Sequence, residues 1–286
     1  MRASRFQNSG SDSCNRRVPR SHVAQLDSAS ALDTFQSAEN RDVITTRVAT
    51  MHLVVFDVDG TLTDSSEVDG KCLWQAAREV LRLPNDHSRW IDDLRHWTDL
   101  CIVSQHCEKR FGRPITSAEV DLIRNRLVRL LQDAPPVRDS GICQIAGASE
   151  ALSIVGAARA FAIAIATGCF LVSAEFKLRS AGLFDASVPL AGSDNTLSRE
   201  EIMLNAARMA AQKHDVEFSG FTYVGDGVWD VKAARNLGWN FIGIGSGERA
   251  EALRQAGAAR IIPHFEPATE FLELLNAYAT QKDSCY

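Results

Sequence analysis

Two aspartates that follow a short apolar stretch are the first residues in this sequence that could do chemistry. Residues 53–56 (LVVF) are enough for one buried strand, and Asp57 and Asp59 come directly after it. Gly60 and Thr61 then begin a run of turn-forming residues. Ligands of open α/β sheets bind beyond the carboxyl ends of the strands, so a strand that ends in paired carboxylates indicates a reactive site.

Two later apolar stretches also end in polar groups that could meet this pair. Thr167 and Gly168 follow residues 161–166, and Asp226 follows residues 221–224. The carboxyl ends of parallel strands lie at one edge of a sheet. We therefore expect these groups to converge on the first pair of aspartates, although they are far apart in the sequence.

Three carboxylates in one place, those of Asp57, Asp59 and Asp226, would repel one another unless a cation neutralised them. Mg²⁺ prefers oxygen ligands and combines one or two carboxylates with waters and phosphate oxygens. Asp230 adds a further carboxylate one helical turn after Asp226. The pattern predicts a Mg²⁺ site at this edge of the sheet.

The groups that follow residues 161–166 suit a phosphate. Thr167 offers a hydroxyl, and the helix start at Gly168 offers backbone N–H groups. A carboxylate can attack phosphorus and form an acyl phosphate, which divides hydrolysis into two easier steps. A neighbouring carboxylate can protonate the leaving oxygen and later deprotonate water. The residues are therefore those of a phosphoryl-transfer site.

The elements that must hold these groups alternate between helix and strand from about residue 143 onward. Strands are expected at residues 161–166, 187–191, 221–224, 241–244 and 260–262. Such alternation indicates an α/β fold, a Rossmann-like parallel sheet with helices on both faces. We expect this core to comprise residues 51–65 and 140–286, interrupted by a helical insert at residues 66–139.

The insert shows the apolar spacing of helices. Apolar residues recur at every third or fourth position within residues 73–81, and again at Ile91, Leu94 and Trp97. Residues 116–119 (TSAE) supply capping residues before another helix.

The composition excludes several classes of partner. With 45% apolar residues, 23% charged residues and a net charge of −5, the chain offers no electrostatic case for binding nucleic acid or a membrane. Its seven cysteines are scattered and contain no C-x-x-C pair, which favours reduced thiols in a cytoplasmic setting. We expect a cytoplasmic monomer or homodimer.

Residues 1–50 differ from the rest of the chain. They are rich in Ser, Asn, Arg and Gln and have few large apolar residues, so they cannot offset their own ordering entropy. Three interpretations are open: a disordered extension, an organelle transit peptide, or a gene-model artefact in a protein whose translation starts at Met51.

Taken together, three motifs resemble those of the haloacid dehalogenase-like hydrolase superfamily. Residues 57–64 (DVDGTLTD) match its first signature, residues 163–168 (IAIATG) look like its second, and residues 225–230 (GDGVWD) look like its fourth. The resemblance extends from Met51 to the end of the chain. It implies a helical cap made by the insert, as in phosphoglycolate-phosphatase-like members.

The resemblance implies a role for each residue. Asp57 would be the nucleophile that becomes aspartyl phosphate. Asp59 would be the general acid and base, and its backbone carbonyl would help to bind Mg²⁺. Asp226 would be a metal ligand, with Asp230 supporting the metal site or the basic residue beside it. Thr167 would hold the phosphoryl group.

The third motif departs from the family pattern. The family usually has a lysine near the start of the helix before the fourth strand, whereas residues 193–200 (SDNTLSRE) contain Arg199 and no lysine. An arginine can neutralise Asp57 and a phosphate with a bidentate fork. The alternative is a solvated arginine at a helix start. Lys177 and Lys213 fit the role less well.

Residues 95–99 (RHWTD) form a polar and aromatic cluster in the insert. Thr98 and Asp99 are candidate substrate contacts. A simpler account is a cap helix with Trp97 in its core and the charges in solvent. Trp229 could either form a wall of the site or merely pack.

Within the family, Asp59 favours phosphoryl chemistry, because dehalogenating members lack an acid two residues after the nucleophile. The resemblance therefore implies a Mg²⁺-dependent phosphatase of a small phosphorylated metabolite. Three alternatives stay open. They are a phosphosugar mutase, a phosphonate hydrolase with a cap lysine such as Lys71 or Lys109, and a non-catalytic protein that binds a phosphate ligand.

Overall fold

The computed structural model describes residues 51–84, 94–134 and 142–280. The chain divides into two units, Met1–Thr46 and Arg47–Tyr286. The first unit lies outside the described residues, and so do our interpretations of residues 1–50. All elements named below belong to the second unit.

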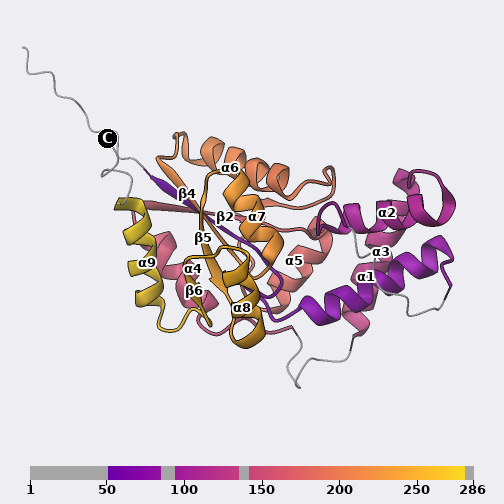
Figure 1. Ribbon diagram of the computed structural model, residues 1–286, viewed down its shortest axis with the longest axis horizontal. Helices are drawn as coiled ribbons and strands as arrows, with labels where there is room; N and C mark the ends of the chain where they lie inside the picture. Colours follow the sequence, from indigo (N-terminus) through magenta and orange to yellow (C-terminus); the bar gives the residue numbers. More distant parts are fainter. Residues whose placement is uncertain (1–50, 85–93, 135–141, 281–286) are drawn as a thin grey trace, which may run out of the picture. The chain divides into compact units, whose positions relative to one another are not determined.

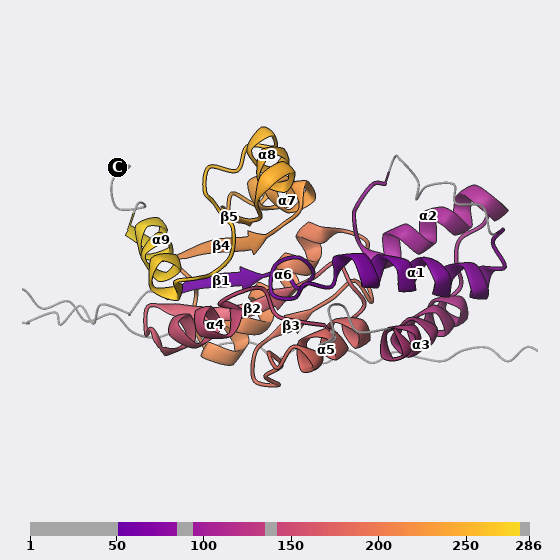
Figure 2. The same cartoon turned by 90° about the horizontal axis from the view of Figure 1, so that it is seen from below.

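Within the described residues, a six-stranded parallel sheet forms the core (Figure 1). Its strands are β1 (His52–Phe56), β2 (Phe161–Ala166), β3 (Leu190–Ala191), β4 (Gly220–Gly225), β5 (Asn240–Ile244) and β6 (Ile261–Ile262). Their order is β3-β2-β1-β4-β5-β6, and Figure 2 shows β5, β4, β1, β2 and β3 one below the other. The parallel α/β fold is confirmed, although β3 begins three residues later than expected.

Helices pack on both faces of this sheet. They are α4 (Ala148–Ala157), α5 (Leu171–Ser180), α6 (Arg199–His214), α7 (Val228–Asn236), α8 (Gly247–Gln255) and α9 (Ala268–Thr280). Val54 and Phe56 of β1 share a hydrophobic cluster with α4 and α9, whereas Leu53 and Val55 share one with α6 and α7. A central parallel strand is covered on both sides, which explains why residues 53–56 are all apolar.

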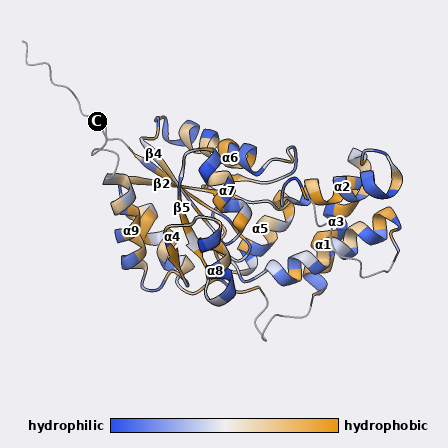
Figure 3. Ribbon diagram, in the orientation of Figure 1, coloured by the Kyte–Doolittle hydropathy of each residue, from blue (hydrophilic) through white to orange (hydrophobic). Residues whose placement is uncertain are grey.

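Three further helices leave the core after β1 and return before α4. They are α1 (Ser66–Leu81), α2 (Asp99–Phe111) and α3 (Ser117–Asp133), and we call them the cap. Their own hydrophobic cluster includes Leu127 and also takes in Phe170 of the core. Figure 3 shows hydrophobic and hydrophilic residues alternating around these helices. No helix in the described residues combines the length and the hydrophobicity needed to cross a membrane.

Local signals in the sequence are formed as expected at two places. Thr116 and Glu119 make the reciprocal hydrogen bonds of a capping box at the start of α3. Gly182, just after α5, has a φ of +72°, the conformation favoured after a helix end. The limits of the insert, residues 66–139, stay a prediction, because residues 135–141 lie outside the described part.

The helix expected around Ile91, Leu94 and Trp97 is wrong where it can be judged. Ile91 lies outside the described residues, and residues 94–97 are not helical. Helix α2 begins at Asp99 instead, because Thr98 has extended backbone and its hydroxyl caps the first turn.

Candidate active site

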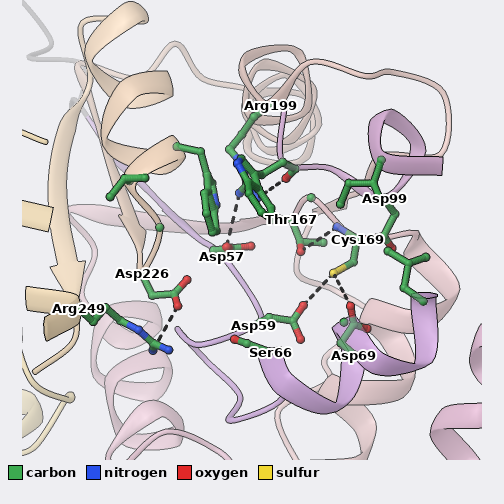
Figure 4. A pocket seen from close by; sticks show the side chains of 18 of the residues that line it. Asp57, Asp59, Ser66, Asp69, Asp99, Thr167, Cys169, Arg199, Asp226 and Arg249 are labelled. Carbon is green, nitrogen blue, oxygen red and sulfur yellow. Dashed lines mark hydrogen bonds and ion pairs between the residues drawn. The ribbon is translucent and has the colours of Figure 1, made fainter. Parts of the chain in front are cut away.

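A cavity of about 540 Å³ lies at the carboxyl ends of β1, β2 and β4 (Figure 4). The residues singled out from the sequence that line it are Asp57, Asp59, Trp97, Asp99, Thr167, Gly168, Arg199, Asp226 and Trp229. Asp230 and Thr98 are not part of its wall. The expected convergence of strand ends therefore brings together the acids, the phosphate-binding turn and the substitute for the motif lysine.

Asp57 follows β1 and is 4% exposed. Its Oδ2 lies 3.4 Å from Nη1 of Arg199, whereas its Oδ1 has no hydrogen-bond partner among the described residues. Burial raises the pKa of Asp57, and the guanidinium of Arg199 offsets only part of that effect. The N–H of Val58 and the hydroxyl of Thr167 also favour the ionised form of this carboxyl. A carboxylate with one oxygen beside a cation and one that makes no hydrogen bond suits a nucleophile.

Arg199 is the first residue of α6, and it is buried. Besides Asp57, it contacts Oδ1 of Asp230 at 2.8 Å and donates hydrogen bonds to the hydroxyl of Tyr223 and the carbonyl of Trp97. Burial would lower the pKa of Arg199, but the two acids raise it well above its ordinary value. Arg199 is therefore a fixed cation beside Asp57, and its burial excludes the alternative of a solvated arginine.

The turn after β2 is shaped to admit this arginine. Thr167 is 1% exposed, and its hydroxyl accepts a hydrogen bond from the backbone N–H of Cys169. A Cβ on Gly168 would lie 2.6 Å from Nη2 of Arg199 and 2.6 Å from the carbonyl oxygen of Trp97. Only glycine at this position lets the phosphate-binding turn and Arg199 approach each other.

Three acids could hold a metal ion beside this turn. Asp57, Asp226 and Asp230 each place a carboxylate oxygen within 4.8 Å of the other two. A Cβ on Gly60 would lie 2.0 Å from Oδ2 of Asp226, so the absence of a side chain at Gly60 makes room for that carboxylate. Crowded acids around the unpartnered Oδ1 of Asp57 are the donor set that a hard divalent cation prefers.

The pKa values in this group agree with a place for a cation. Burial, and then the nearby Asp230 and Asp57, raise the pKa of Asp226 well above its ordinary value. Burial raises the pKa of Asp230 to about 7, against the opposing effect of Arg199. A bound cation would favour the ionised forms of these acids. The residues present therefore fit a metal ion.

Asp230 lies nearer the basic residue than the other acids of this group. Its Oδ1 contacts Arg199, and its Oδ2 accepts a hydrogen bond from the N–H of Gly227 at 2.9 Å. Asp226, in contrast, contacts the half-exposed Arg249 at 3.2 Å. These contacts favour Asp226 as the metal ligand and Asp230 as the support of Arg199.

Asp59 belongs to a second group of residues, which reaches the cap. Its Oδ1 accepts a hydrogen bond from Ser65 at 2.5 Å. Its Oδ2 accepts hydrogen bonds from Nζ of Lys177 at 2.6 Å and from the thiol of Cys169 at 2.8 Å. The same Lys177 donates to Oδ1 of Asp69, on α1 of the cap, at 2.7 Å. One lysine of the core thus joins Asp59 to the cap.

This second group has one cation for two acids. Burial would lower the pKa of Lys177, but Asp59 and Asp69 raise it well above its ordinary value. Burial would raise the pKa of Asp59, yet Lys177 and the other donors bring it below its usual range. Burial raises the pKa of Asp69 to about 6. Because Lys177 cannot neutralise both carboxylates, Asp69 is the acid of this pair that takes up a proton more readily.

Cys169 is a hydrogen-bond donor in this group. Burial and the neighbouring Asp59 and Asp69 raise the pKa of its thiol well above the ordinary value. A neutral thiol is a weak nucleophile, since the thiolate is the reactive form. Cys169 therefore supports Asp59 and has no covalent chemistry to offer at this site.

The start of α2 joins the cap to the core. Asp99 donates its backbone N–H to the carbonyl of Gly168 at 2.7 Å, and its side chain accepts from the N–H of Phe170 at 2.9 Å. Thr98 is 1% exposed, and its hydroxyl donates to a core carbonyl just before α6. Asp99 lines the cavity, as a substrate contact must, whereas Thr98 serves the docking of the cap.

Two indole rings form one wall of the cavity. Trp97 of the cap stacks on Trp229 of α7, with ring centroids 4.8 Å apart and planes at 22°. Trp97 is 42% exposed, so the expectation that it lies in the core of a cap helix is wrong. Trp229 lies over Gly227, where a Cβ would meet its ring at 2.2 Å. Trp229 therefore walls the site.

Sequence reasoning missed Asp69 and considered Lys177 only as a poorer fit for the motif lysine, although a signal for their pairing was present. Lys177 is buried on α5 together with Ser173 and Leu178, and Asp69 is buried on α1 together with Leu73. Each charge interrupts the apolar face of its own helix. Two such interruptions of opposite sign, on helices that follow the first two strands, indicate a buried ion pair.

The motifs and this geometry match a known family. A family model of haloacid dehalogenase-like hydrolases matches residues 51–238, more than half of the chain. The chain belongs to this family. As a haloacid dehalogenase-like hydrolase it is an enzyme, and all three of its recognised motifs lie within the matched range.

Solved structures share the fold of this haloacid dehalogenase-like hydrolase. CbbY from Rhodobacter sphaeroides in complex with phosphate is 19% identical, with a TM-score of 0.54 over 76% of this chain and 96% of that one. A putative β-phosphoglucomutase from Bacteroides vulgatus is 15% identical, with a TM-score of 0.54 over 81% and 91%. A predicted phosphoglycolate phosphatase from Haemophilus somnus is 16% identical, with a TM-score of 0.53 over 78% and 98%. No curated protein matches the sequence.

Proposed function

We propose that this hydrolase is a Mg²⁺-dependent phosphatase that hydrolyses a small phosphomonoester through a phosphoaspartate at Asp57. The observation that carries the proposal is the state of Asp57, whose one oxygen lies beside Arg199 while the other has no partner. That carboxylate shares the cavity wall with the turn at Thr167 and with the second acid, Asp59.

Each of the candidate catalytic and phosphate-binding residues has a task in this reaction. Asp57 attacks phosphorus, and the turn at Thr167 and Gly168 holds the phosphoryl oxygens with a hydroxyl and backbone N–H groups. Arg199 neutralises charge on Asp57 and on the phosphoryl group. Asp59 gives a proton to the leaving oxygen and takes one from the attacking water.

Mg²⁺ would be held by the carboxylates of Asp57 and Asp226 and by the backbone carbonyl of Asp59. Such an ion supplies positive charge that stabilises phosphoryl oxygens during transfer. The crowding and raised pKa values of the metal-free acids support this assignment. Arg249, which contacts Asp226, also lines the cavity. It is therefore placed to contact an anionic substrate that enters there.

The cap wall favours a phosphatase over a mutase. Among the described residues, the cap lines the cavity with Ser66, Asp69, Gly70, Leu73, Trp97, Asp99 and Ile102. That wall offers acids, apolar groups and the hydroxyl of Ser66, but no lysine or arginine. A mutase must hold a bisphosphate intermediate, whose second phosphate needs cations or donors on the side away from Asp57.

The cap side of the cavity also disfavours a phosphonate hydrolase. Such an enzyme would form an imine with a cap lysine. Lys71 is exposed and pairs with Glu67, and Lys109 is also exposed. Neither lysine lines the cavity. The leaving group that fits the described wall is an alcohol without a second negative charge and with an apolar part.

Hydrolysis of p-nitrophenyl phosphate tests the reaction. Purified protein should release nitrophenol with Mg²⁺ and lose this activity in EDTA. Asp57→Asn, which keeps the shape of the nucleophile, should abolish turnover while the protein remains folded by circular dichroism. A non-catalytic phosphate-binding protein would instead bind inorganic phosphate without turnover in either form.

A panel of phosphorylated compounds tests the substrate class. Phosphate release should be faster from monoesters of neutral or cationic alcohols, such as glycerol phosphate and phosphocholine, than from phosphoglycolate or sugar bisphosphates. Isomerisation of a sugar phosphate in the presence of its bisphosphate would identify a mutase and refute the substrate proposal.

The proposal also places the enzyme in the cytoplasm. Cys72, Cys101, Cys107 and Cys169 are buried thiols in this fold, which agrees with a reducing compartment. Cell fractionation with an antibody against the native protein tests this placement. Light scattering distinguishes the monomer from the homodimer.

A further inference from the structure

Lys177 is the group whose position the proposed reaction leaves unexplained. It is fully buried, and its ammonium has partners for all three N–H groups: Asp59 at 2.6 Å, Asp69 at 2.7 Å and the sulfur of Cys169 at 3.1 Å. Two of these partners belong to the core and one to the cap.

A purely structural role does not account for this placement. A buried ion pair stabilises a fold no better than well-packed apolar residues of the same volume, because both charges lose their hydration. Lys177 lies on the apolar face of α5 next to Leu178, where a methionine would pack without that cost. What a lysine adds at this position is three directed hydrogen bonds, one of which ends on Asp59.

We propose that Lys177 positions the Asp59 carboxylate for proton transfer at the leaving-group oxygen, and that Asp69 holds Lys177 in place only when the cap is docked on the core. This inference rests on the proposed phosphatase function. Lys177 is then a positioning residue, since it acts on the substrate through Asp59. The cap controls the acid of the core through one shared lysine.

The bonds that change show what Lys177 must achieve. First, with Asp59 carrying the proton that it took from water in the previous turnover, an oxygen of Asp57 bonds to phosphorus, the bond from phosphorus to the leaving oxygen breaks, and that proton moves to the leaving oxygen. Then a water oxygen bonds to phosphorus, the bond to Asp57 breaks, and the proton of the water moves to Asp59. Both transfers need the Asp59 carboxyl at one place, and Ser65, Cys169 and Lys177 together hold both of its oxygens.

Substrates that differ in their need for a proton separate this role from a structural one. Nitrophenolate leaves without a proton, whereas an alkoxide needs one. In Lys177→Met, kcat/KM for ethyl phosphate should fall by about 100-fold, as when a general acid is misplaced, while that for p-nitrophenyl phosphate should fall less than about 3-fold. Equal losses on both substrates would overturn the proposal, because a distorted site slows both.

Three comparison variants complete the test. Asp59→Asn sets the loss expected when the acid itself is removed, and it should show the same preference for p-nitrophenyl phosphate. Asp69→Asn keeps Lys177 and the shape of the cap, and should lower the ethyl phosphate value by roughly 10-fold. An unchanged ratio of the two substrates in Asp69→Asn would refute the part played by the cap. Lys213→Met removes an exposed lysine outside the cavity and should change neither value.

The test does not depend on whether the Lys177→Met variant folds stably. If Lys177→Met is unstable, the double variant Lys177→Met/Asp69→Leu removes both partners of the ion pair and should fold, because apolar replacements of buried pairs are tolerated. It should show the same substrate dependence as Lys177→Met, and equal losses would overturn the proposal. Failure of the phosphatase function itself looks different, since the unmodified protein would then hydrolyse neither ester.

Discussion

The active site holds two groups of acids, each arranged around one buried cation, and the groups differ in where their members come from. In the first, Arg199 lies between Asp57 and Asp230, and all three belong to the core. Asp57 follows β1, Arg199 is the first residue of α6, and Asp230 lies in the first turn of α7. These strand and helix ends lie at the same edge of the sheet. This group needs only the parallel sheet to form.

In the second group, Lys177 lies between Asp59 of the core and Asp69 of the cap. Its geometry depends on how the cap lies on the core. In the proposed mechanism, the attack on phosphorus therefore uses the core alone, whereas proton transfer uses the core with the cap docked. Each of the following variants acts on one group and should leave the other intact.

Loss of Arg199 should have the largest effect. Arg199→Ala leaves Asp57 and Asp230 buried without their shared cation, so kcat for p-nitrophenyl phosphate should fall by about 10²- to 10³-fold. Steady-state kinetics with saturating Mg²⁺ measure this. Arg199→Lys keeps a charge of the kind usual in the family and should recover part of the activity. Unchanged kinetics in Arg199→Ala would remove this residue from the site.

Mg²⁺ should stabilise the folded protein through the first group only. A ligand at 100 times its dissociation constant adds about 2.7 kcal/mol to the free energy of unfolding. Thermal unfolding in Mg²⁺ and in EDTA should therefore differ for the unmodified protein. The difference should disappear in Asp226→Asn and persist in Asp69→Asn, because Asp69 lies in the second group. A Mg²⁺ shift that survives in Asp226→Asn would place the metal elsewhere.

The second group should show itself in the pH dependence of stability. The pKa of Asp69 is about 6 in the folded protein against an ordinary value of 3.8. The folded state thus holds this proton more tightly, so the protein loses stability as pH rises from about 4 to about 6. A pKa difference of about two units lowers the free energy of unfolding by about 3 kcal/mol over this range. Asp69→Asn avoids that loss, but it also removes a hydrogen bond worth about 1 kcal/mol at every pH.

In EDTA, Asp69→Asn should therefore be about 1 kcal/mol less stable than the unmodified protein at pH 4 and roughly 2 kcal/mol more stable at pH 7. Urea unfolding at several pH values measures the difference. A constant difference across this range would show that Asp69 titrates normally. A variant that is more stable yet slower on ethyl phosphate would show that the strain at Asp69 serves the reaction.

The sequence predicts Asp57 and Arg199 of the first group, and the neighbouring Asp226 and Thr167, because each of them marks the end or the start of an element. Asp57 and Asp226 end apolar stretches, Thr167 does so too, and Arg199 opens a helix after a serine that caps it. A parallel sheet places such ends side by side, with β1 between β2 and β4. Convergence therefore follows from topology, without knowledge of packing angles.

The second group could not be predicted in the same way. The contact of Lys177 with Asp69 joins two helices that only the docking of the cap brings together. That docking rests on Phe170 within the cap cluster and on hydrogen bonds at the start of α2. The spacing of Leu94 and Trp97 misled for the same reason, because Leu94 packs against the cap cluster and Trp97 lines the cavity, and neither lies in a helix of its own.

The smallest effect should come from the stacked indoles where the two groups face the substrate. Trp97→Ala removes a ring from the cavity wall but keeps the backbone carbonyl that binds Arg199. An aromatic contact of this kind contributes about 0.5–1.5 kcal/mol, so KM for the preferred monoester should rise by about 2- to 10-fold with little change in kcat. Trp239→Ala is the matched control, because its ring stacks on Phe221 at 4.8 Å but does not line the cavity. It should lower stability and leave KM unchanged, and a similar KM for both variants would show that the indole wall does not contact the substrate.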